Sequence, residues 1–164
     1  MNILAADIGT HTGFACIIGG QRFSGVWDSS RTRRESPGMV FVHFRAHLMR
    51  FLREQQAQWN LAVTEQGHQR GSATESLLGL AGIFGEVMCS QCPECQFTTV
   101  QSGELKKFTT GGGKASKADM IAAANERWGY LYPSGDTDSD DEADARALLE
   151  YAITNYDGGT DATT

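Results

Sequence analysis

The sequence predicts an α/β protein in which a five-stranded mixed sheet carries helices on both faces. Strand-like runs come first and surround the turn pair Gly19-Gly20, which suits a tight hairpin. Helical and strand-like segments then alternate along the chain, as they do where helices cross over between neighbouring strands. With 164 residues, the chain is long enough to bury the core of one such domain without disulfides.

The first part of the chain is expected to supply three strands, a loop and a helix. Residues 2–6 form a short apolar strand that is closed by Asp7. The two hairpin strands follow within 13–27, and a polar loop over 29–38 is expected to expose its basic residues. Apolar residues at helical spacing then predict a helix over 37–58.

The middle of the chain is expected to continue with strands and a helix in alternation. A short apolar run over 60–65 predicts a strand that ends in Glu65, and a helix follows over about 72–88. The next apolar run, 96–100, predicts another buried strand. These segments complete the expected sheet.

The last part of the chain begins with a short helical turn and a glycine loop, after which a helix begins near Ser116. A flexible acidic loop is expected over 134–141, and the final helix follows over 142–156. Its apolar face is expected to contain Ala145, Leu148, Leu149, Ala152 and Ile153. We expect one domain over 1–156 and a disordered tail over 157–164.

The composition is that of a soluble globular protein, with 40% hydrophobic and 21% charged residues. No run is long enough to span a membrane, and the chain opens without the pattern of a signal peptide. A cytoplasmic location without a membrane partner is therefore expected. Four cysteines, three of them within "CSQCPEC", do not resemble a secreted disulfide framework.

The net charge of −6 is unevenly distributed along the chain. Residues 136–164 contain nine acids and one base and contribute −8, which leaves +2 on the first 135 residues. Basic residues in that part gather at 31–34 and 106–117. The chain is therefore expected to form a mildly basic body with an acidic end, and such a body can meet phosphates.

Acidic side chains stand at the ends of three separate elements. Asp7 and Glu65 each end a strand. Strands joined by a helical crossover tend to lie parallel, and ligand sites gather at their carboxyl ends. Asp141 and Asp144 lie about one turn apart at the start of the final helix. Asp144 shares its helix face with Ala145, so it is expected to point toward the sheet.

Carboxylates that converge without a nearby base repel one another and raise their own pKa values. No lysine or arginine is spaced to pair with Asp144 locally. Hard divalent cations such as Mg²⁺ prefer oxygen ligands, and two of them about 4 Å apart can clamp the reacting oxygens of a phosphodiester. The acids therefore predict a metal site, with helix capping as the structural alternative. For Asp140 and Glu142 we favour a structural role over metal binding, as helix-capping residues or as part of a solvated acidic run.

These residues resemble motifs of the RuvC-like Holliday junction resolvases, within the RNase H-like nuclease superfamily. "ILAADIGTHTGFA" is similar to their first-strand motif, and "VTEQGHQRGSAT" is similar to their fourth-strand glutamate segment. "DDEADARALLEYAI" resembles their terminal helix with its D-x-x-D pattern. The order and spacing match from about residue 2 to 155, so the resemblance implies an RNase H-like domain over 1–156.

The resemblance implies a catalytic, metal-binding quartet that consists of Asp7, Glu65, Asp141 and Asp144. This quartet would bind two Mg²⁺ or Mn²⁺ ions. The resemblance further implies a homodimer that nicks a DNA four-way junction symmetrically and leaves a 5′-phosphate and a 3′-hydroxyl. The expected enzyme is therefore a crossover junction endodeoxyribonuclease with branched DNA as its substrate and no small-molecule substrate. The helix over 72–88 is the candidate dimer surface, although burial within the domain competes for it.

Four further residues are candidates for DNA contacts. Lys114 and Lys117 stand beside a glycine loop at a helix start, where backbone N–H groups and the helix dipole favour phosphate. The resemblance places a lysine-rich DNA-contacting segment in the same region. His68 and Arg70 follow Glu65 in a loop that could steer DNA or protonate a leaving oxygen. Solvated surface side chains are the alternative for all four.

Two features depart from the family pattern. Arg146 stands where these resolvases more often carry leucine, and "CSQCPEC" is an insertion that is not typical of them. The spacing of Cys89, Cys92 and Cys95 is typical of zinc ligands. Structural zinc requires four ligands, however, and the sequence places no fourth cysteine or histidine close to these three. A reduced, partly buried thiol cluster at a helix end is therefore expected rather than a zinc site.

Parts of the sequence also fit three functions other than a nuclease that cuts branched DNA. "DIGTHTG" resembles the first phosphate loop of the actin and sugar-kinase ATPases, but those proteins need two such domains and this chain has room for one. An RNase H-type ribonuclease that cuts hybrids would use the same acids. A catalytically silent module that grips branched DNA is the third alternative, and the presence of four costly carboxylates argues against it.

Overall fold

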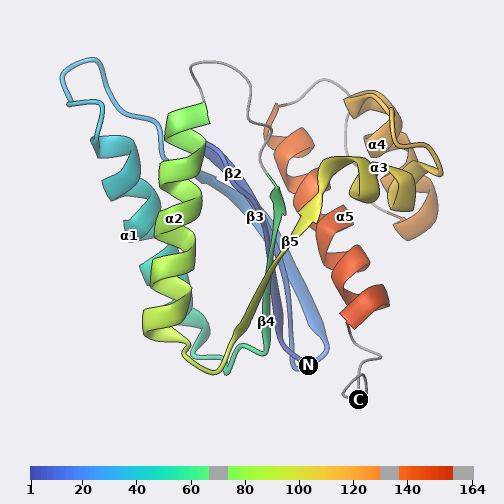
Figure 1. Ribbon diagram of the computed structural model, residues 1–164, viewed down its shortest axis with the longest axis horizontal. Coiled ribbons are helices and arrows are strands. Elements are labelled where there is room, and N and C mark those ends of the chain that lie inside the picture. Colours follow the sequence, from blue (N-terminus) through green and yellow to red (C-terminus); the bar gives the residue numbers. More distant parts are fainter. Residues whose placement is uncertain (67–73, 130–136, 157–164) are drawn as a thin grey trace.

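The computed structural model describes residues 1–66, 74–129 and 137–156, and it shows a sheet with helices on both faces (Figure 1). The elements in chain order are β1 (Ile3–Asp7), β2 (His11–Ile18), β3 (Gln21–Asp28), α1 (Met39–Gln55), β4 (Leu61–Gln66), α2 (Thr74–Gln91), β5 (Gln96–Gln101), α3 (Ser102–Thr110), α4 (Lys117–Trp128) and α5 (Thr137–Tyr156). The tail expected over 157–164 lies outside the described residues.

The five strands form one mixed sheet in the order β3-β2-β1-β4-β5. β2 pairs antiparallel with both β1 and β3, whereas β4 pairs parallel with both β1 and β5. The parallel strands are connected through α1 and α2, because a parallel connection has to cross from one end of the sheet to the other. The predicted mixed α/β sheet is confirmed.

The hairpin between β2 and β3 turns at Gly19 and Gly20, whose φ angles are 57° and 85°. Both angles lie in the left-handed region that glycine adopts without steric cost. A two-residue loop of this kind matches the right-handed twist of the flanking strands. The hairpin predicted from the glycine pair is confirmed, and its second strand forms one edge of the sheet.

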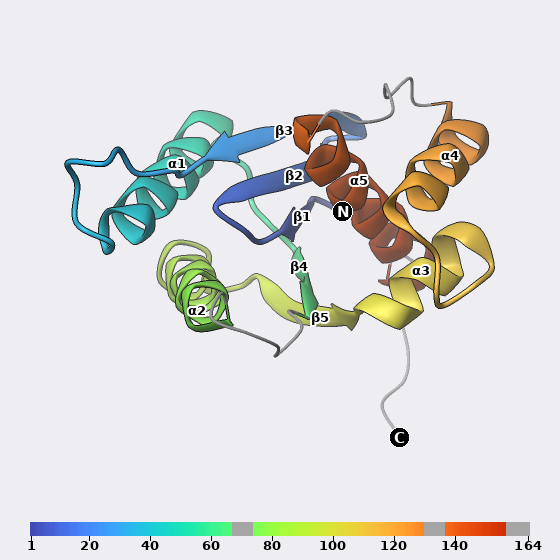
Figure 2. The ribbon, with the colours of Figure 1, turned by 90° about the horizontal axis from the view of Figure 1, so that it is seen from above.

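Two hydrophobic cores lie on opposite faces of the sheet (Figure 2). Alternate residues of β1 divide between them, as the pleat of a strand requires. Ile3 and Ala5 belong to the core under α5, while Leu4 and Ala6 belong to the core under α1 and α2. Helices therefore cover both faces, as the sequence predicts.

The apolar face predicted for α5 is confirmed. Its buried members are Ala145, Leu148, Leu149 and Ala152, and Ile153 is half-buried. Among the described residues, no helix combines the length and the apolar character that a membrane crossing requires.

Two helices differ from the sequence expectation. α3 is a helix of nine residues rather than a short turn. α5 begins at Thr137, inside the segment expected to be an acidic loop. Aspartate is unfavourable within a helix, but the helix dipole stabilises negative charge in the first turn. The acidic run therefore starts the helix instead of preceding it.

The backbone of α5 lies directly against Gly13 of β2, the residue that pairs with Asp7 in the sheet. A Cβ atom at position 13 would stand 1.8 Å from the carbonyl oxygen of Asp141, far inside any real contact distance. Only glycine fits at this position. The start of α5 can therefore lie this close to β2 only because Gly13 has no side chain.

Gly13→Ala is expected to lower the free energy of unfolding by about 1–3 kcal/mol, because the added methyl group has to push α5 away from the sheet. Gly103→Ala is the matched control, since a Cβ atom at Gly103 in α3 would meet nothing within 4 Å. The control should be neutral or slightly stabilising. Urea unfolding followed by circular dichroism measures both, and equal midpoints for the two variants would contradict the close approach.

Candidate active site

The register of the parallel pair β1–β4 places Asp7 beside Glu65. Ala6 pairs with Thr64, so the next residues along stand at the same level on neighbouring strands. On β1, Asp7 continues the alternate positions to which Ala5 belongs, and these face the core under α5. The two carboxylates therefore share one face and one edge of the sheet.

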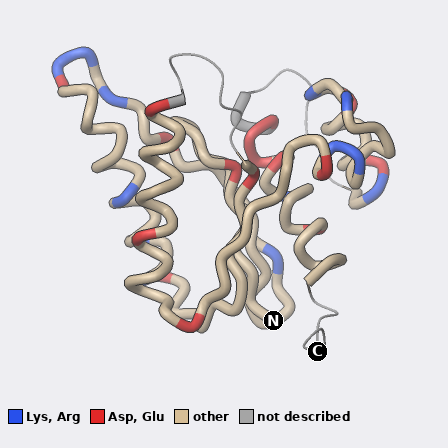
Figure 3. The backbone as a smooth tube through the Cα atoms, in the orientation of Figure 1, with Lys and Arg blue, Asp and Glu red and all other residues tan. Residues whose placement is uncertain are grey.

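α5 brings a third carboxylate to this edge. The helix packs on β1, β2, β3 and β4, with Ala145 in the core below it. Asp144 immediately precedes Ala145, and Asp141 lies one turn earlier, where the helix touches Gly13. Figure 3 shows acidic residues from the sheet and from α5 gathered in the same region.

Three carboxylates face one pocket of about 220 Å³. Its lining residues are Asp7, Glu65, Ser102, Lys106, Lys117, Met120 and Asp144. They come from β1, β4, α3, α4 and α5. Asp141, the fourth acid of the expected quartet, is not among the lining residues, but its charge acts on both Asp7 and Asp144.

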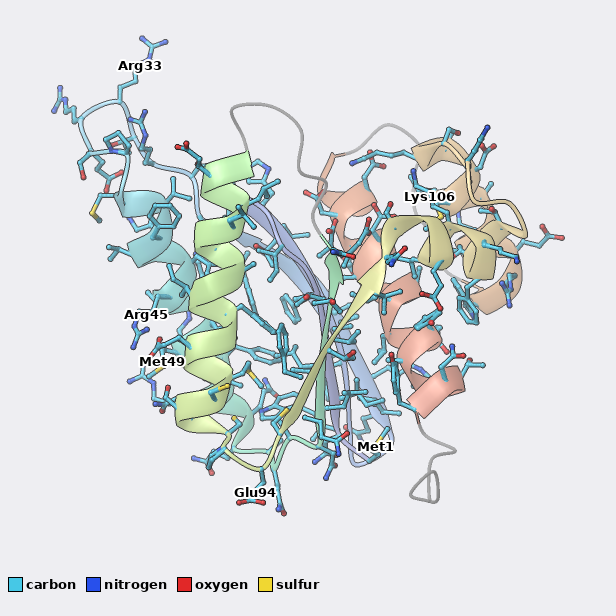
Figure 4. All side chains as sticks on the ribbon, in the orientation of Figure 1. Met1, Arg33, Arg45, Met49, Glu94 and Lys106 are labelled. Atoms are coloured by element: carbon cyan, nitrogen blue, oxygen red, sulfur yellow. The ribbon has the colours of Figure 1, made fainter. Side chains whose placement is uncertain are left out.

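The helices α3 and α4 supply the two lysines of the pocket. Lys106 lies on α3, where it is labelled in Figure 4. Lys117 is the first residue of α4, and a capping box fixes this end of the helix. The Asp119 N–H donates to Ser116 Oγ at 3.3 Å, and the Ser116 N–H donates to Asp119 Oδ2 at 2.9 Å. The cap thereby holds Lys117 at the pocket.

Burial raises the pKa of the Asp7 carboxyl from 3.8 to about 8. The charge of Glu65 is the next cause, followed by the charges of Asp144 and Asp141. Lys117 acts in the opposite direction. Because this pKa lies above 7, Asp7 is mostly protonated at neutral pH when the pocket holds no cation.

Burial also raises the pKa of Asp144, to about 6, and the charge of Glu65 adds to the shift. Lys117 lowers the pKa of Asp144 and so acts as a positive partner. The sequence suggests no such partner, because Arg146 is two residues away on a different helix face and no other base is spaced to pair with Asp144. The fold supplies one from α4. Its charge offsets only part of the repulsion, since both pKa values stay raised.

The donor set of the pocket suits a hard divalent cation. Carboxylate oxygens are the ligands that Mg²⁺ and Mn²⁺ prefer, and the raised pKa values of Asp7 and Asp144 reflect burial and an excess of negative charge that a cation would relieve. In the part of the chain that the structure describes, no three acidic, histidine or cysteine side chains form a ready metal cage. Glu65 and the two aspartates would therefore have to draw together on binding.

The solvated acidic run expected at Asp140 and Glu142 is wrong. One carboxylate oxygen of Asp140 is buried and accepts no hydrogen bond from a described residue. Glu142 accepts a hydrogen bond from Ser24 Oγ at 2.5 Å and pairs with Arg146 at 3.0 Å. Because α5 begins before these residues, it holds them against the protein instead of leaving them in solvent.

Arg146 ties the start of α5 to the edge strand β3. Its Nε donates to Ser24 Oγ at 2.6 Å, and its Nη2 lies 3.0 Å from Glu142 Oε1. Further along the helix, Arg22 Nε donates to Glu150 Oε1 at 3.1 Å. The arginine that departs from the family pattern therefore fastens the helix that carries acids to the pocket.

Of the four residues expected to contact DNA, two fall within the described residues. Lys117 lines the pocket, whereas Lys114 lines a separate surface hollow of about 460 Å³ together with acidic residues of α4. His68 and Arg70 lie outside the described residues.

Two pocket residues, Ser102 and Lys106, are absent from the sequence prediction. They lie four residues apart on α3 and therefore on one face of that helix. The charge of Lys106 is visible in the basic stretch 106–117. The sequence predicts only a short helical turn here, and a short turn does not place Ser102 and Lys106 on one face. The full length of α3 is therefore the information that the sequence analysis lacks.

The clustered cysteines lie at the end of α2, at the other end of the sheet from the pocket (Figure 1). Cys89 is exposed, Cys92 and Cys95 are half-buried, and all three are free thiols. Burial raises the pKa of Cys95 to about 11, and Cys92 and Cys89 add to the shift. The cluster is therefore partly buried and lies at a helix end, as the sequence predicts.

The sheet order and the helix layers define the RNase H-like α/β fold in the form that RuvC has. The structure matches RuvC of Thermus thermophilus with a TM-score of 0.68 at 13% identity, over 94% of this chain and 96% of that one. The same protein in complex with a Holliday junction substrate matches at 0.67 and 15% identity, over 94% and 96%. The yeast mitochondrial Holliday junction resolvase matches at 0.60 and 13% identity, over 94% and 80%.

No family model matches the chain, and no curated protein matches it either. At 13–15% identity, the structural likeness establishes the fold. The RNase H-like fold that the sequence motifs imply is thereby confirmed.

Asp7→Asn is expected to stabilise the metal-free protein at alkaline pH. The pKa of Asp7 is about 8 in the folded protein against 3.8 ordinarily, so between these values the folded state holds a proton that the unfolded chain releases. The free energy of unfolding therefore falls as pH rises through this window, and the variant lacks that fall. In chelator, its Tm should exceed that of the wild type near pH 8.5 and approach it near pH 4.

Glu94→Gln is the control for this measurement, because Glu94 is exposed at the opposite end of the molecule (Figure 4). It should reproduce the wild-type dependence of Tm on pH. A wild-type profile in Asp7→Asn would instead show that Asp7 ionises normally in the fold.

Arg146→Leu is expected to cost about 1–3 kcal/mol of unfolding free energy, because it leaves Glu142 half-buried without its charged partner. Arg45→Leu removes the pair of Arg45 with Glu86, in which both side chains are exposed, and should cost less than about 1 kcal/mol. Urea unfolding of the two variants measures the difference. An equally small loss of unfolding free energy in both variants would show that the contacts of Arg146 stabilise the protein no more than a surface ion pair does.

Proposed function

We propose that the protein is a divalent-metal-dependent endonuclease that cuts branched DNA, with a four-way junction as its main substrate. The observation that carries this proposal is the pocket in which Asp7, Glu65 and Asp144 meet Lys106 and Lys117. A nuclease has to hold cations and a phosphate anion in one place, and this mixture of side chains suits both. A protein of the same fold has been solved with a Holliday junction substrate, which supports the choice of DNA.

Within the proposed quartet, the charges of the other three acids all act on Asp7, which makes it the best candidate to bridge two ions. Glu65 and Asp144 would complete the ligand sets, and Asp141 would help to position an ion or the attacking water. Bound Mg²⁺ or Mn²⁺ would supply positive charge at the attacking and leaving oxygens of an in-line displacement. Because Asp7 has to lose its proton first, metal affinity should rise with pH up to about 8.

The lysines of the pocket would act on the phosphate. Lys106 and Lys117 would donate hydrogen bonds to the non-bridging oxygens of the phosphate. These bonds would hold the phosphate in the pocket that the acids also line. The hydroxyl of Ser102 lines the same pocket and would add a neutral donor. Attack of water on the phosphorus would break the bond to the 3′ oxygen and leave a 5′-phosphate and a 3′-hydroxyl.

We further propose that the enzyme works as a homodimer, since symmetric nicking of a junction needs two active sites. α2 offers less apolar surface to a partner subunit than its sequence suggests, because part of its apolar face is buried within the domain. Leu80, Phe84 and Met88 of this helix are buried in the core of the domain itself. Leu78 remains 58% exposed, and the exposed ring of Phe97 lies next to Phe84, so an apolar surface is still present around α2.

The proposal is tested by incubating the protein with a synthetic four-way junction, a fork, an RNA–DNA hybrid and a linear duplex, with Mg²⁺ or with chelator. The junction should be cut in Mg²⁺ alone. Asp7→Asn and Asp144→Asn should each lower the rate by more than the ~10–100-fold that changes outside the ligand shell usually cost. Glu54→Gln, which removes an exposed acid on α1, is the matched control and should cut like the wild type.

Each other result would favour a different function. Cleavage of the hybrid without cleavage of the junction would identify a ribonuclease of the RNase H type. Tight binding to the junction without cleavage would identify a silent binding module. The partial compensation of the acids by Lys117 makes the silent module the second candidate, because it lessens the need for a cation.

A further inference from the structure

The loop between β3 and α1, residues 29–38, is held in place by hydrogen bonds. The Ser29 N–H donates to the carbonyl of Thr10 at 2.8 Å, which ties the loop to the turn after β1. The Thr32 N–H donates to Glu35 Oε2 at 2.6 Å, and the Glu35 N–H donates back to the carbonyl of Thr32 at 3.2 Å. His43 Nδ1 of α1 donates to the carbonyl of Ser30 at 3.1 Å. Hydrogen bonds within the loop and to its neighbours therefore fix the conformation of residues 29–38.

The acidic groups near this loop are engaged in holding it. Glu35 is the single acid among residues 29–38, and it accepts from Thr32 and lies 3.4 Å from His43. Asp28, just before the loop, accepts from the Ser30 N–H at 2.8 Å. Of the three arginines, Arg31 donates to the carbonyl of Glu35 at 3.2 Å. The other two arginines of the loop, Arg33 and Arg34, take no part in these contacts.

Arg33 and Arg34 are both exposed, and neither forms a hydrogen bond or ion pair with a described residue. Figure 4 shows the side chain of Arg33 extending away from the tip of the loop. Two guanidinium groups next to each other on an ordered loop are set up to bind anions, because each presents a planar fork of N–H donors that matches phosphate oxygens.

The loop lies at the same end of the molecule as the pocket but on the other side of it from α3 and α4. Figures 1 and 2 agree on this placement, with the loop beside the start of α1 and with α3 and α4 across the sheet. Figure 3 shows basic residues on the loop and on α3 and α4, with the acidic residues between them. The chain thus carries two basic regions separated by the acidic pocket.

We propose that Arg33 and Arg34 form a second phosphate-binding site, which holds a duplex arm of the branched DNA away from the phosphate that is cut. This inference rests on the proposed function. A four-way junction extends arms beyond the cutting site, so a basic loop set apart from the pocket can contact a backbone that a single short duplex in the pocket does not reach. Such contacts fix the position of the DNA without reading its sequence.

The test measures binding to a labelled four-way junction in chelator, over a series of salt concentrations, for the wild type and for Arg33→Ala/Arg34→Ala. Each phosphate contact contributes about 0.9 to the slope of log affinity against log salt. The double variant should lower the magnitude of that slope by about 1–2 and weaken binding. Its Tm should match that of the wild type, because both arginines are exposed and neither forms a hydrogen bond or ion pair with a described residue.

Arg50→Ala/Arg53→Ala is the matched control, since it removes the same charge from exposed arginines near the other end of α1. With 17 residues, α1 places its last turn about 25 Å from its start. This control should keep the wild-type slope. On junctions whose arms are progressively shortened, the wild type should lose its advantage over Arg33→Ala/Arg34→Ala.

The possible failures can be told apart. If the wild type binds and cuts the junction while Arg33→Ala/Arg34→Ala keeps its slope, the second site is wrong and the proposed function stands. An equal loss in the control pair, or a loss that persists on short arms, would also overturn the arm contact. Failure of the wild type to bind any junction would overturn this inference together with the proposed function.

Discussion

The approach of α5 to Gly13 is the contact on which the arrangement of the acids depends. Gly13 pairs with Asp7 across the sheet, so a helix that rests on Gly13 brings its own acids toward the strand ends. The hydrogen bonds that join Arg146, Ser24 and Glu142 fix the same part of the helix to β3. The acids themselves repel one another and cannot hold this geometry. The backbone contact at Gly13 and the half-buried hydrogen bonds of Arg146 keep the acids in this arrangement.

The pocket combines two opposite requirements. Burial of its carboxylates is unfavourable, and the raised pKa values of Asp7 and Asp144 are the sign of that cost. Lys117 offsets part of it, which stabilises the protein without a cation and also places a positive charge where a phosphate would lie. A net charge of −6 is compatible with binding DNA, because nine of the 20 acids lie within residues 136–164, a stretch that contains only one of the 14 bases.

Local patterns in the sequence were enough to predict the class of fold. The strand runs, the Gly19-Gly20 turn and the alternation of helices with strands each depend on residues close together in the chain, and the structure confirms all three. The start of α5 was missed because the same acidic residues that disfavour a helix interior are favoured in its first turn. A residue pattern alone does not distinguish these two positions.

By itself, the sequence determined which acids stand at the ends of strands and at the start of the last helix, since that information lies within each segment. Only the tertiary structure decided what surrounds them. Lys106 and Lys117 reach the pocket from two helices that are separated in the chain from Asp7 by about a hundred residues, and Glu142 leaves solvent to pair with Arg146. Charge compensation depends on distances through space, and spacing along a chain does not give those distances for segments joined by long connections.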